Sequence, residues 1–193
     1  ILTLLEPFDL GRGADRALNG PAVHLIVEAE KLAYADRDRY IADPEFVPVP
    51  AGLTDGAYLA ERRKAIAAGQ AMPPPKPGLP PGLDRQGFGL DQTVERAGTS
   101  HISVIDRDGN AVAMTTTIEG AFGSGVMTGG FLLNNELTDF SMRPVDGQGR
   151  AAANRIEPGK RPRSTMAPTL VFDQKGQLSA VLGSPGGGRI VLY

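Results

Sequence analysis

After Asn19, apolar residues recur every three or four positions, which is the spacing of one face of an α-helix. Asn19 is a favourable N-cap, and Pro21 suits the first turn of a helix. The pattern therefore predicts a long helix from this point, which the charged residues 36–39 extend until Pro44 ends it. We expect these charged residues to form a solvated helix end with local ion pairs rather than part of a catalytic site.

The first 98 residues contain one further predicted helix and then a change in composition. The helix is expected at 55–68 and is closed by Gly69. Residues 71–98 are too rich in proline and glycine for a helix or a central strand, so they predict an extended, exposed connector. Such a segment accommodates cleavage easily, although an ordinary linker has the same composition.

From residue 101 onward the pattern becomes that of β-strands. Residues 101–106 and 111–118 are rich in β-branched side chains and flank a turn at 107–110, which predicts a hairpin. A second hairpin is expected from strands at 168–172 and 178–182. Helices followed by paired strands are typical of a layered α+β domain.

Composition and charge exclude several classes of function. The 193 residues are 41% hydrophobic, enough for one sizeable core or one domain with an appendage. The net charge is −2 with both signs interspersed, so no basic stripe indicates nucleic acid or a membrane surface. The absence of cysteine excludes disulfides, thiolate metal sites and a cysteine nucleophile. The two histidines are far apart in sequence, so a zinc site is not expected, and no apolar run approaches the roughly 20 residues of a membrane span.

Five motifs in order carry a resemblance to a known family. They are TSHISVIDRDGNAV, FGSG, LLNNELTDFS, GKRPRSTMAPT and GSPGGGRI. Together they resemble the γ-glutamyltranspeptidase family of N-terminal-nucleophile hydrolases, and EAEKLAYADRDRYIADP resembles the last helices of that family's large subunit. The resemblance implies an αββα sandwich that is incomplete in this chain. It also divides the chain into the helical end of a large subunit (1–70), a connector ending at the autoprocessing site (71–98) and the β-rich start of a small subunit (99–193).

The same resemblance implies a threonine nucleophile. The precursor would be cut between Gly98 and Thr99, so that the Thr99 hydroxyl attacks and its freed α-amine, with an ordinary pKa of roughly 8, acts as base. Thr117 matches a second threonine that orients the nucleophile, and Gly186 and Gly187 match the backbone donors to the oxyanion. From the residues alone, Thr117 could equally be a strand-forming threonine, and SPGGGR a tight turn or a weak anion cradle.

Substrate recognition is implied by polar residues in two of the motifs. A γ-glutamyl group presents an α-amine, for which Glu136 and Asp139 match the family's acceptors, and an α-carboxylate, for which Ser164 and Thr165 match its hydroxyl donors. On their own these four could be turn and cap residues. Glu119 stands where the family usually has asparagine, and its carboxylate would repel the substrate's own unless it is protonated or turned away. The family's carboxylate-binding arginine lies upstream of this segment.

The expected function is therefore an autoprocessing enzyme that transfers or hydrolyses γ-glutamyl groups of glutathione-like amides. An acylase of the cephalosporin or glutaryl type and an uncut, non-catalytic homologue are the alternatives. The expected partners are a small-molecule amide substrate and the two subunits of one precursor, and copies of the protein could form a homo-oligomer. No metal, nucleotide or redox cofactor is implied, and the resemblance favours a periplasmic or extracellular location over a cytoplasmic one.

Overall fold

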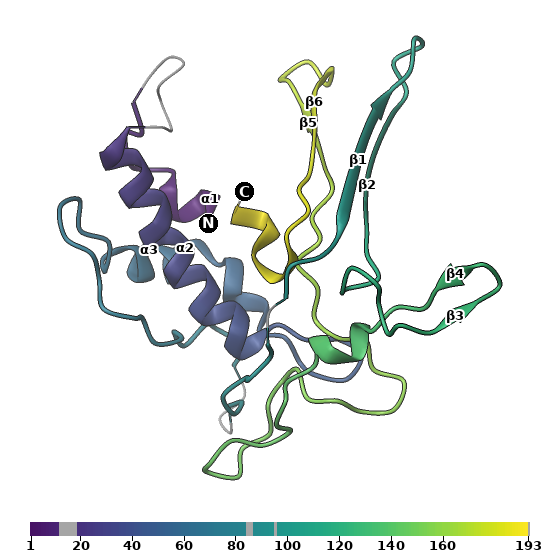
Figure 1. The fold of residues 1–193 in the computed structure, drawn as a ribbon. Coiled ribbons are helices and arrows are strands. Elements are labelled where there is room, and N and C mark those ends of the chain that lie inside the picture. The colour runs from purple at the N-terminus through teal and green to yellow at the C-terminus, as the bar shows by residue number, and fades with distance from the viewer. Residues whose placement is uncertain (12–18, 84–86, 95, 193) are drawn as a thin grey trace. The chain divides into compact units, whose positions relative to one another are not determined.

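A computed structural model of the chain describes residues 1–11, 19–83, 87–94 and 96–192 (Figure 1). These residues form two compact units. The first unit comprises residues 1–91 and 143–160, and the second comprises 92–142 and 161–192. Among the described residues, no helix is both long enough and apolar enough to cross a lipid bilayer.

The first unit is built around the long helix α2 (Gly20–Tyr40). The Asn19 side chain accepts a hydrogen bond of 2.8 Å from the backbone N–H of Ala22, which confirms the predicted N-cap. The apolar face of α2 packs against two short helices, α1 (Leu2–Leu5) and α3 (Gly56–Arg63), and a 3₁₀ turn, η1 (Ala51–Thr54), precedes α3. The main hydrophobic core of this unit consists of Leu4, Leu5, Leu25, Ala29, Leu32 and Ile66.

Helix α3 is shorter than the helix predicted at 55–68. Asp55 caps its N-terminus by accepting a hydrogen bond of 2.8 Å from the Tyr58 N–H. After Arg63 the backbone amides of Lys64 and Ile66 bond three residues back, so the helix tightens and stops. Ile66 is buried in the core at this point. Burial of Ile66 thus overrides a local pattern that would have continued to Gly69.

The charged residues 36–39 are only in part the solvated helix end that the sequence predicts. Arg37 and Asp38 form the expected local ion pair, 2.8 Å long, with the Asp38 side chain 51% exposed. Asp36 contradicts the prediction, because its side chain is only 10% exposed and belongs to a buried polar network. A sequence pattern read on one helix does not reveal the other segments that cover it.

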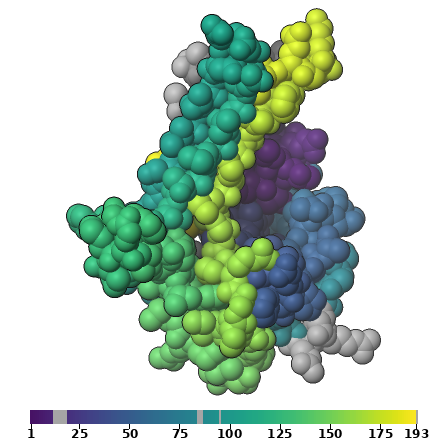
Figure 2. Space-filling view, turned by 90° about the vertical axis from the view of Figure 1, so that its right-hand side faces the viewer, coloured from purple at the N-terminus to yellow at the C-terminus, as the bar shows by residue number. Residues whose placement is uncertain are grey.

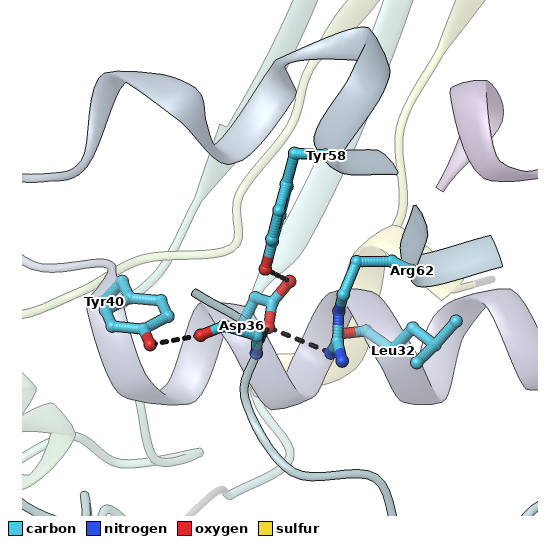
Figure 3. Close-up of polar contacts among 6 residues, drawn as sticks. Leu32, Asp36, Tyr40, Tyr58 and Arg62 are labelled. Atoms are coloured by element: carbon cyan, nitrogen blue, oxygen red, sulfur yellow. Dashed lines mark hydrogen bonds and ion pairs between the residues drawn. The ribbon is translucent and has the colours of Figure 1, made fainter. Parts of the chain in front are cut away.

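The Asp36 carboxylate joins three parts of the first unit (Figure 3). It accepts hydrogen bonds from the Tyr58 hydroxyl (2.7 Å), the Arg62 guanidinium (3.0 Å) and the backbone N–H of Gly78 (2.7 Å). One turn further along α2, the Tyr40 hydroxyl donates to the Gly78 carbonyl at 2.5 Å. Asp36 therefore ties α2, α3 and the proline-rich segment together, and burial beside this carboxylate raises the pKa of Tyr58 above its ordinary value.

The described residues of 71–98 form neither a helix nor a strand. Besides the contacts at Gly78, this segment is bound to α2 near its start, at Met72. Glu28 accepts a hydrogen bond of 2.7 Å from the Met72 N–H, and Lys31 donates to the Met72 carbonyl at 2.8 Å. The proline-rich segment therefore follows α2 between Met72 and Gly78. A cut between Gly98 and Thr99, and hence the division into two subunits, stays a prediction.

The described residues of the second unit form three β-hairpins and two short 3₁₀ helices. Both predicted hairpins are present. The first begins one residue early and its two strands end one and two residues before the expected positions, and the second begins one residue late. The hairpins are β1 (Ser100–Ile105) with β2 (Ala111–Thr116), β3 (Met127–Thr128) with β4 (Phe131–Leu132), and β5 (Thr169–Phe172) with β6 (Leu178–Leu182). The 3₁₀ helices are η2 (Glu136–Asp139) and η3 (Gly187–Leu192).

The first and last of these hairpins lie side by side, teal and yellow in Figures 1 and 2. The Ser103 hydroxyl on β1 links them by donating to the Val181 carbonyl on β6 at 3.3 Å. The chain thus combines helices with small antiparallel sheets, which confirms the mixed α+β class. The four-layer sandwich stays a prediction.

Candidate active site

The two candidate threonines lie at the same end of the first hairpin. β1 and β2 pair in an antiparallel register that places Ser100 opposite Thr116. Thr99 immediately precedes β1 and Thr117 immediately follows β2. The register therefore places Thr99 and Thr117 at the same end of the hairpin, although they are far apart in sequence.

The backbone of Thr99 has an unusual conformation. Its φ angle is 87°, in a region that a β-branched residue rarely adopts. Conformations of this kind cost about 1–3 kcal/mol and cluster at functional sites. The strain at Thr99 is adjacent to the peptide bond that joins it to Gly98.

The Gly98 carbonyl, on the other side of that bond, is held by a candidate oxyanion donor. The backbone N–H of Gly186 donates to the Gly98 oxygen at 3.0 Å. Gly186 has a φ of 136°, which L side chains rarely adopt, so a glycine suits this position. A donor in this place would stabilise negative charge on the Gly98 oxygen if the carbonyl carbon were attacked.

Two glycines let the backbone segments of the site pass very close to one another. A Cβ on Gly98 would overlap the backbone carbonyl of Glu119. A Cβ on Gly187, whose φ is 82°, would overlap the backbone carbonyl of Arg96. Neither glycine has room for a side chain, so the segment before Thr99 fits closely between the loops that carry Glu119 and Gly187.

Glu119 is a buried carboxylate in the turn after β2. Its backbone N–H donates to Thr117 Oγ1 at 2.8 Å, and its φ angle is 68°. The Asn135 amide donates to Glu119 Oε2, while Asn135 Oδ1 accepts from the Gly120 N–H at 2.9 Å. Glu119 Oε1 has no hydrogen-bond partner among the described residues, and its ion-pair partner, Arg96 Nε, lies 4.0 Å away.

Two further carboxyl groups, those of Glu136 and Asp139, lie on η2. Burial, the adjacent Asp139 and the charge of Glu119 together raise the pKa of the Glu136 carboxyl to about 7. Its Oε1 is buried and has no hydrogen-bond partner in the part of the chain that the structure describes. Three acidic groups therefore share one region of the site, which favours a cationic group among them.

The two candidate carboxylate-binding hydroxyls differ in their surroundings. The Thr165 hydroxyl donates to the Gly187 carbonyl at 3.4 Å, which links Thr165 to the first residue of η3. Ser164 is exposed, and its hydroxyl accepts from the Met166 N–H at 3.1 Å. The structure thus links Thr165 to Gly187, whereas the recorded contact of Ser164 is only local.

Sequence reasoning missed two residues of this site, Arg96 and Asn135. Asn135 lies within the motif LLNNELTDFS, and its amide bridges Glu119 and Gly120. Arg96 belongs to the low-complexity connector, where no local signal marks it. Among the described residues, no three histidine or acidic side chains form a group that could hold a metal ion.

Comparison with known proteins places this chain in a family. The model of the γ-glutamyltranspeptidase family matches residues 1–193. The chain is 41% identical over 201 residues to the glutathione hydrolase proenzyme of Escherichia coli strain K12, covering 99% of this chain and 32% of that protein. It therefore spans about a third of the length of the curated relatives that it matches.

Acylases are also among the relatives. The acylase ACY 1 proenzyme of Pseudomonas sp. strain V22 is 41% identical over 193 residues, covering 98% of this chain and 31% of that protein. The crystal structure of cephalosporin acylase from Bacillus halodurans matches with a TM-score of 0.73 and 28% identity, covering 96% of this chain and 30% of that one. Because the family model matches the chain from end to end and the similarity extends to glutathione hydrolases, this chain belongs to the γ-glutamyltranspeptidase family.

Proposed function

We propose that the full-length protein is an autoprocessing threonine enzyme that transfers or hydrolyses γ-glutamyl groups of glutathione-like amides. The observation that carries this proposal is the hydrogen bond from the Gly186 N–H to the Gly98 carbonyl, next to Thr99. The proposed fold of the whole protein is the αββα sandwich, in which the large and small subunits of one precursor associate after cleavage.

Self-cleavage would use groups that already surround the Gly98–Thr99 bond. The Thr99 oxygen bonds to the Gly98 carbonyl carbon, its hydroxyl proton passes to the Thr99 nitrogen as the C–N bond breaks, and the Gly186 N–H stabilises the oxyanion formed between these two events. The Thr99 nitrogen thereby becomes a free amine. Water hydrolyses the ester and leaves Gly98 as a carboxylate. Release of the strained Thr99 backbone favours this direction.

The mature site would repeat the same chemistry on a substrate amide. The free α-amine of Thr99 has an ordinary pKa of roughly 8, so it can accept the hydroxyl proton near neutral pH. Thr117, at the same end of the hairpin, orients the nucleophile. Departure of the Gly98 carboxylate frees the Gly186 N–H, which with Gly187 as the second proposed donor would stabilise the oxyanion of the substrate.

The acidic side of the site supports a γ-glutamyl donor. Glu136 and Asp139, with Glu119 beside them, provide acceptors for a substrate ammonium group. Ser164 and Thr165 are the proposed hydroxyl donors to the α-carboxylate. A glutaryl or adipyl side chain has no ammonium group, so the acidic cluster would give it no comparable attraction.

An acylase is the second candidate function, and the similarity to acylases is the observation that favours it. Glu119 does not separate the two functions, because its buried carboxylate would repel the free carboxylate of a γ-glutamyl, glutaryl or adipyl group alike unless one of the two is protonated. Initial rates with γ-glutamyl-p-nitroanilide and with the glutaryl and adipyl amides of p-nitroaniline separate the two, because the proposal predicts faster turnover of the γ-glutamyl amide.

Mutation of Thr99 tests the nucleophile. Thr99→Ala in the full-length precursor should abolish both cleavage and turnover, because the variant lacks the attacking hydroxyl and is therefore not cut to give a free terminus at residue 99. Thr116→Ala, an exposed strand threonine nearby, is the matched control and should retain both. Unchanged turnover by Thr99→Ala would rule out the proposed mechanism, and an uncut, inactive wild-type protein would instead support the non-catalytic alternative.

A further inference from the structure

His101 connects the strand of the proposed nucleophile to the loop of the proposed oxyanion donors. It lies on β1, two residues after Thr99, and its imidazole ring fills the space beside Gly183. Gly183 directly follows β6 and precedes Gly186 by three residues. A Cβ on Gly183 would overlap the ring, although the φ angle of this glycine lies outside the left-handed region. Gly183 is therefore needed for space rather than for backbone conformation.

Hydrogen bonds fix the ring in a defined orientation. His101 Nδ1 lies 2.8 Å from Thr115 Oγ1 on β2, and Nε2 lies 3.0 Å from Ser103 Oγ. Ser103 donates its one hydroxyl proton to the Val181 carbonyl on β6, so it can only accept from His101. In the neutral tautomer that matches these contacts, Nε2 donates to Ser103 Oγ and Nδ1 accepts from the Thr115 hydroxyl. This chain of donors and acceptors runs from β2 through β1 to β6.

We propose that His101 is a positioning residue that sets the spacing between Thr99 and the donors Gly186 and Gly187. The ring seated against Gly183 keeps β1 and the loop after β6 at a fixed separation, and its two hydrogen bonds prevent it from rotating away. A misplacement of about 1 Å between reacting groups costs on the order of 100-fold in rate. This inference rests on the proposed function, because it needs Thr99 to be the nucleophile.

The consequence is tested by filling the space that the ring occupies. In the full-length precursor, Gly183→Ala should slow cleavage between Gly98 and Thr99 about 100-fold. The processed form should lose kcat to a similar extent with KM within about twofold, because the oxyanion donors act in the transition state. Gly147→Ala is the matched control, since a Cβ at Gly147 has no neighbour within 4 Å. Equal effects at Gly183 and Gly147 would overturn the proposal.

A double-mutant cycle separates positioning from a general loss of stability. His101→Ala removes the ring and should itself slow cleavage, but it also makes room for the new methyl group. Adding Gly183→Ala to His101→Ala should then change the rate less than about threefold. An additional 100-fold loss in the double variant would overturn the proposal, as would failure of the double variant to fold when His101→Ala folds. If Gly183→Ala alone does not fold, recovery of folding in the double variant supports the same steric contact.

The N-terminal sequence of the small fragment of the wild-type protein shows whether a failed test contradicts this inference or the proposed function. A wild-type protein without a new terminus at Thr99 contradicts the proposed function itself. A wild-type protein cut at Thr99 whose Gly183→Ala variant is cut at the normal rate contradicts only the role of His101.

Discussion

Gly98→Ala should block self-cleavage of the full-length precursor by moving the carbonyl that is attacked. The new Cβ would overlap the backbone carbonyl of Glu119, so residues 98 and 119 must separate. The hydrogen bond from the Gly186 N–H to the Gly98 oxygen is 3.0 Å long, and an increase of about 1 Å would take it beyond the range of a hydrogen bond. Removing one oxyanion donor costs on the order of 100- to 1,000-fold in rate, or about 2.7–4 kcal/mol of transition-state stabilisation.

The assay is a time course of purified precursor, in which denaturing electrophoresis follows the intact chain and mass spectrometry identifies the new terminus. We expect Gly98→Ala to be cut 100- to 1,000-fold more slowly than the wild type, on the magnitude above. Gly147→Ala introduces the same methyl group in open space and should be cut at the wild-type rate. Cleavage of Gly98→Ala at the wild-type rate would refute the reasoning that the close approach of Gly98 to Glu119 keeps the Gly98 carbonyl within hydrogen-bond distance of the Gly186 N–H.

Two further predictions concern carboxyl groups, one buried (Asp36) and one half-buried (Glu136). Asp36→Ala should lower the free energy of unfolding of the first unit by about 3–5 kcal/mol in a urea titration, because it leaves Arg62 buried without its ion-pair partner. The more exposed Asp38→Ala should change it by no more than about 1 kcal/mol. The pKa of Glu136 is raised to about 7 from an ordinary value of 4.5, so its contribution to stability is complete below about pH 4.5 and is lost as the pH rises to about 7. Urea midpoints measured from about pH 4 to about pH 8, a range that includes both pKa values, should show this decline in stability in the wild type but not in Glu136→Gln. An unchanged decline in the variant would contradict the assignment of the raised pKa to Glu136.

Elements with local signals could be predicted from the sequence. The helix start at Asn19 follows from one side chain bonding an amide three residues away. The first hairpin follows from β-branched strands around a turn in which Asp106 accepts hydrogen bonds from the amides of Asp108 and Asn110. In both cases the stabilising contacts lie within a few residues of one another, so the pattern along the chain contains the information.

Contacts between distant segments could not be predicted in this way. The burial of Asp36 depends on Tyr58 and on Gly78, which approach it from other segments of the chain. The candidate site shows the same limit. The motif resemblance identified Gly98 and Gly186 separately. Only the fold brings the N–H of Gly186 to the carbonyl of Gly98.

The most direct test of the central claim is the N-terminal sequence of the small fragment of the purified full-length protein. We predict two chains, with the smaller one beginning at Thr99 and the larger one ending at Gly98. Activity on γ-glutamyl-p-nitroanilide should appear in step with this terminus. A single uncut chain with full γ-glutamyl activity, or a terminus elsewhere in an active enzyme, would contradict the account.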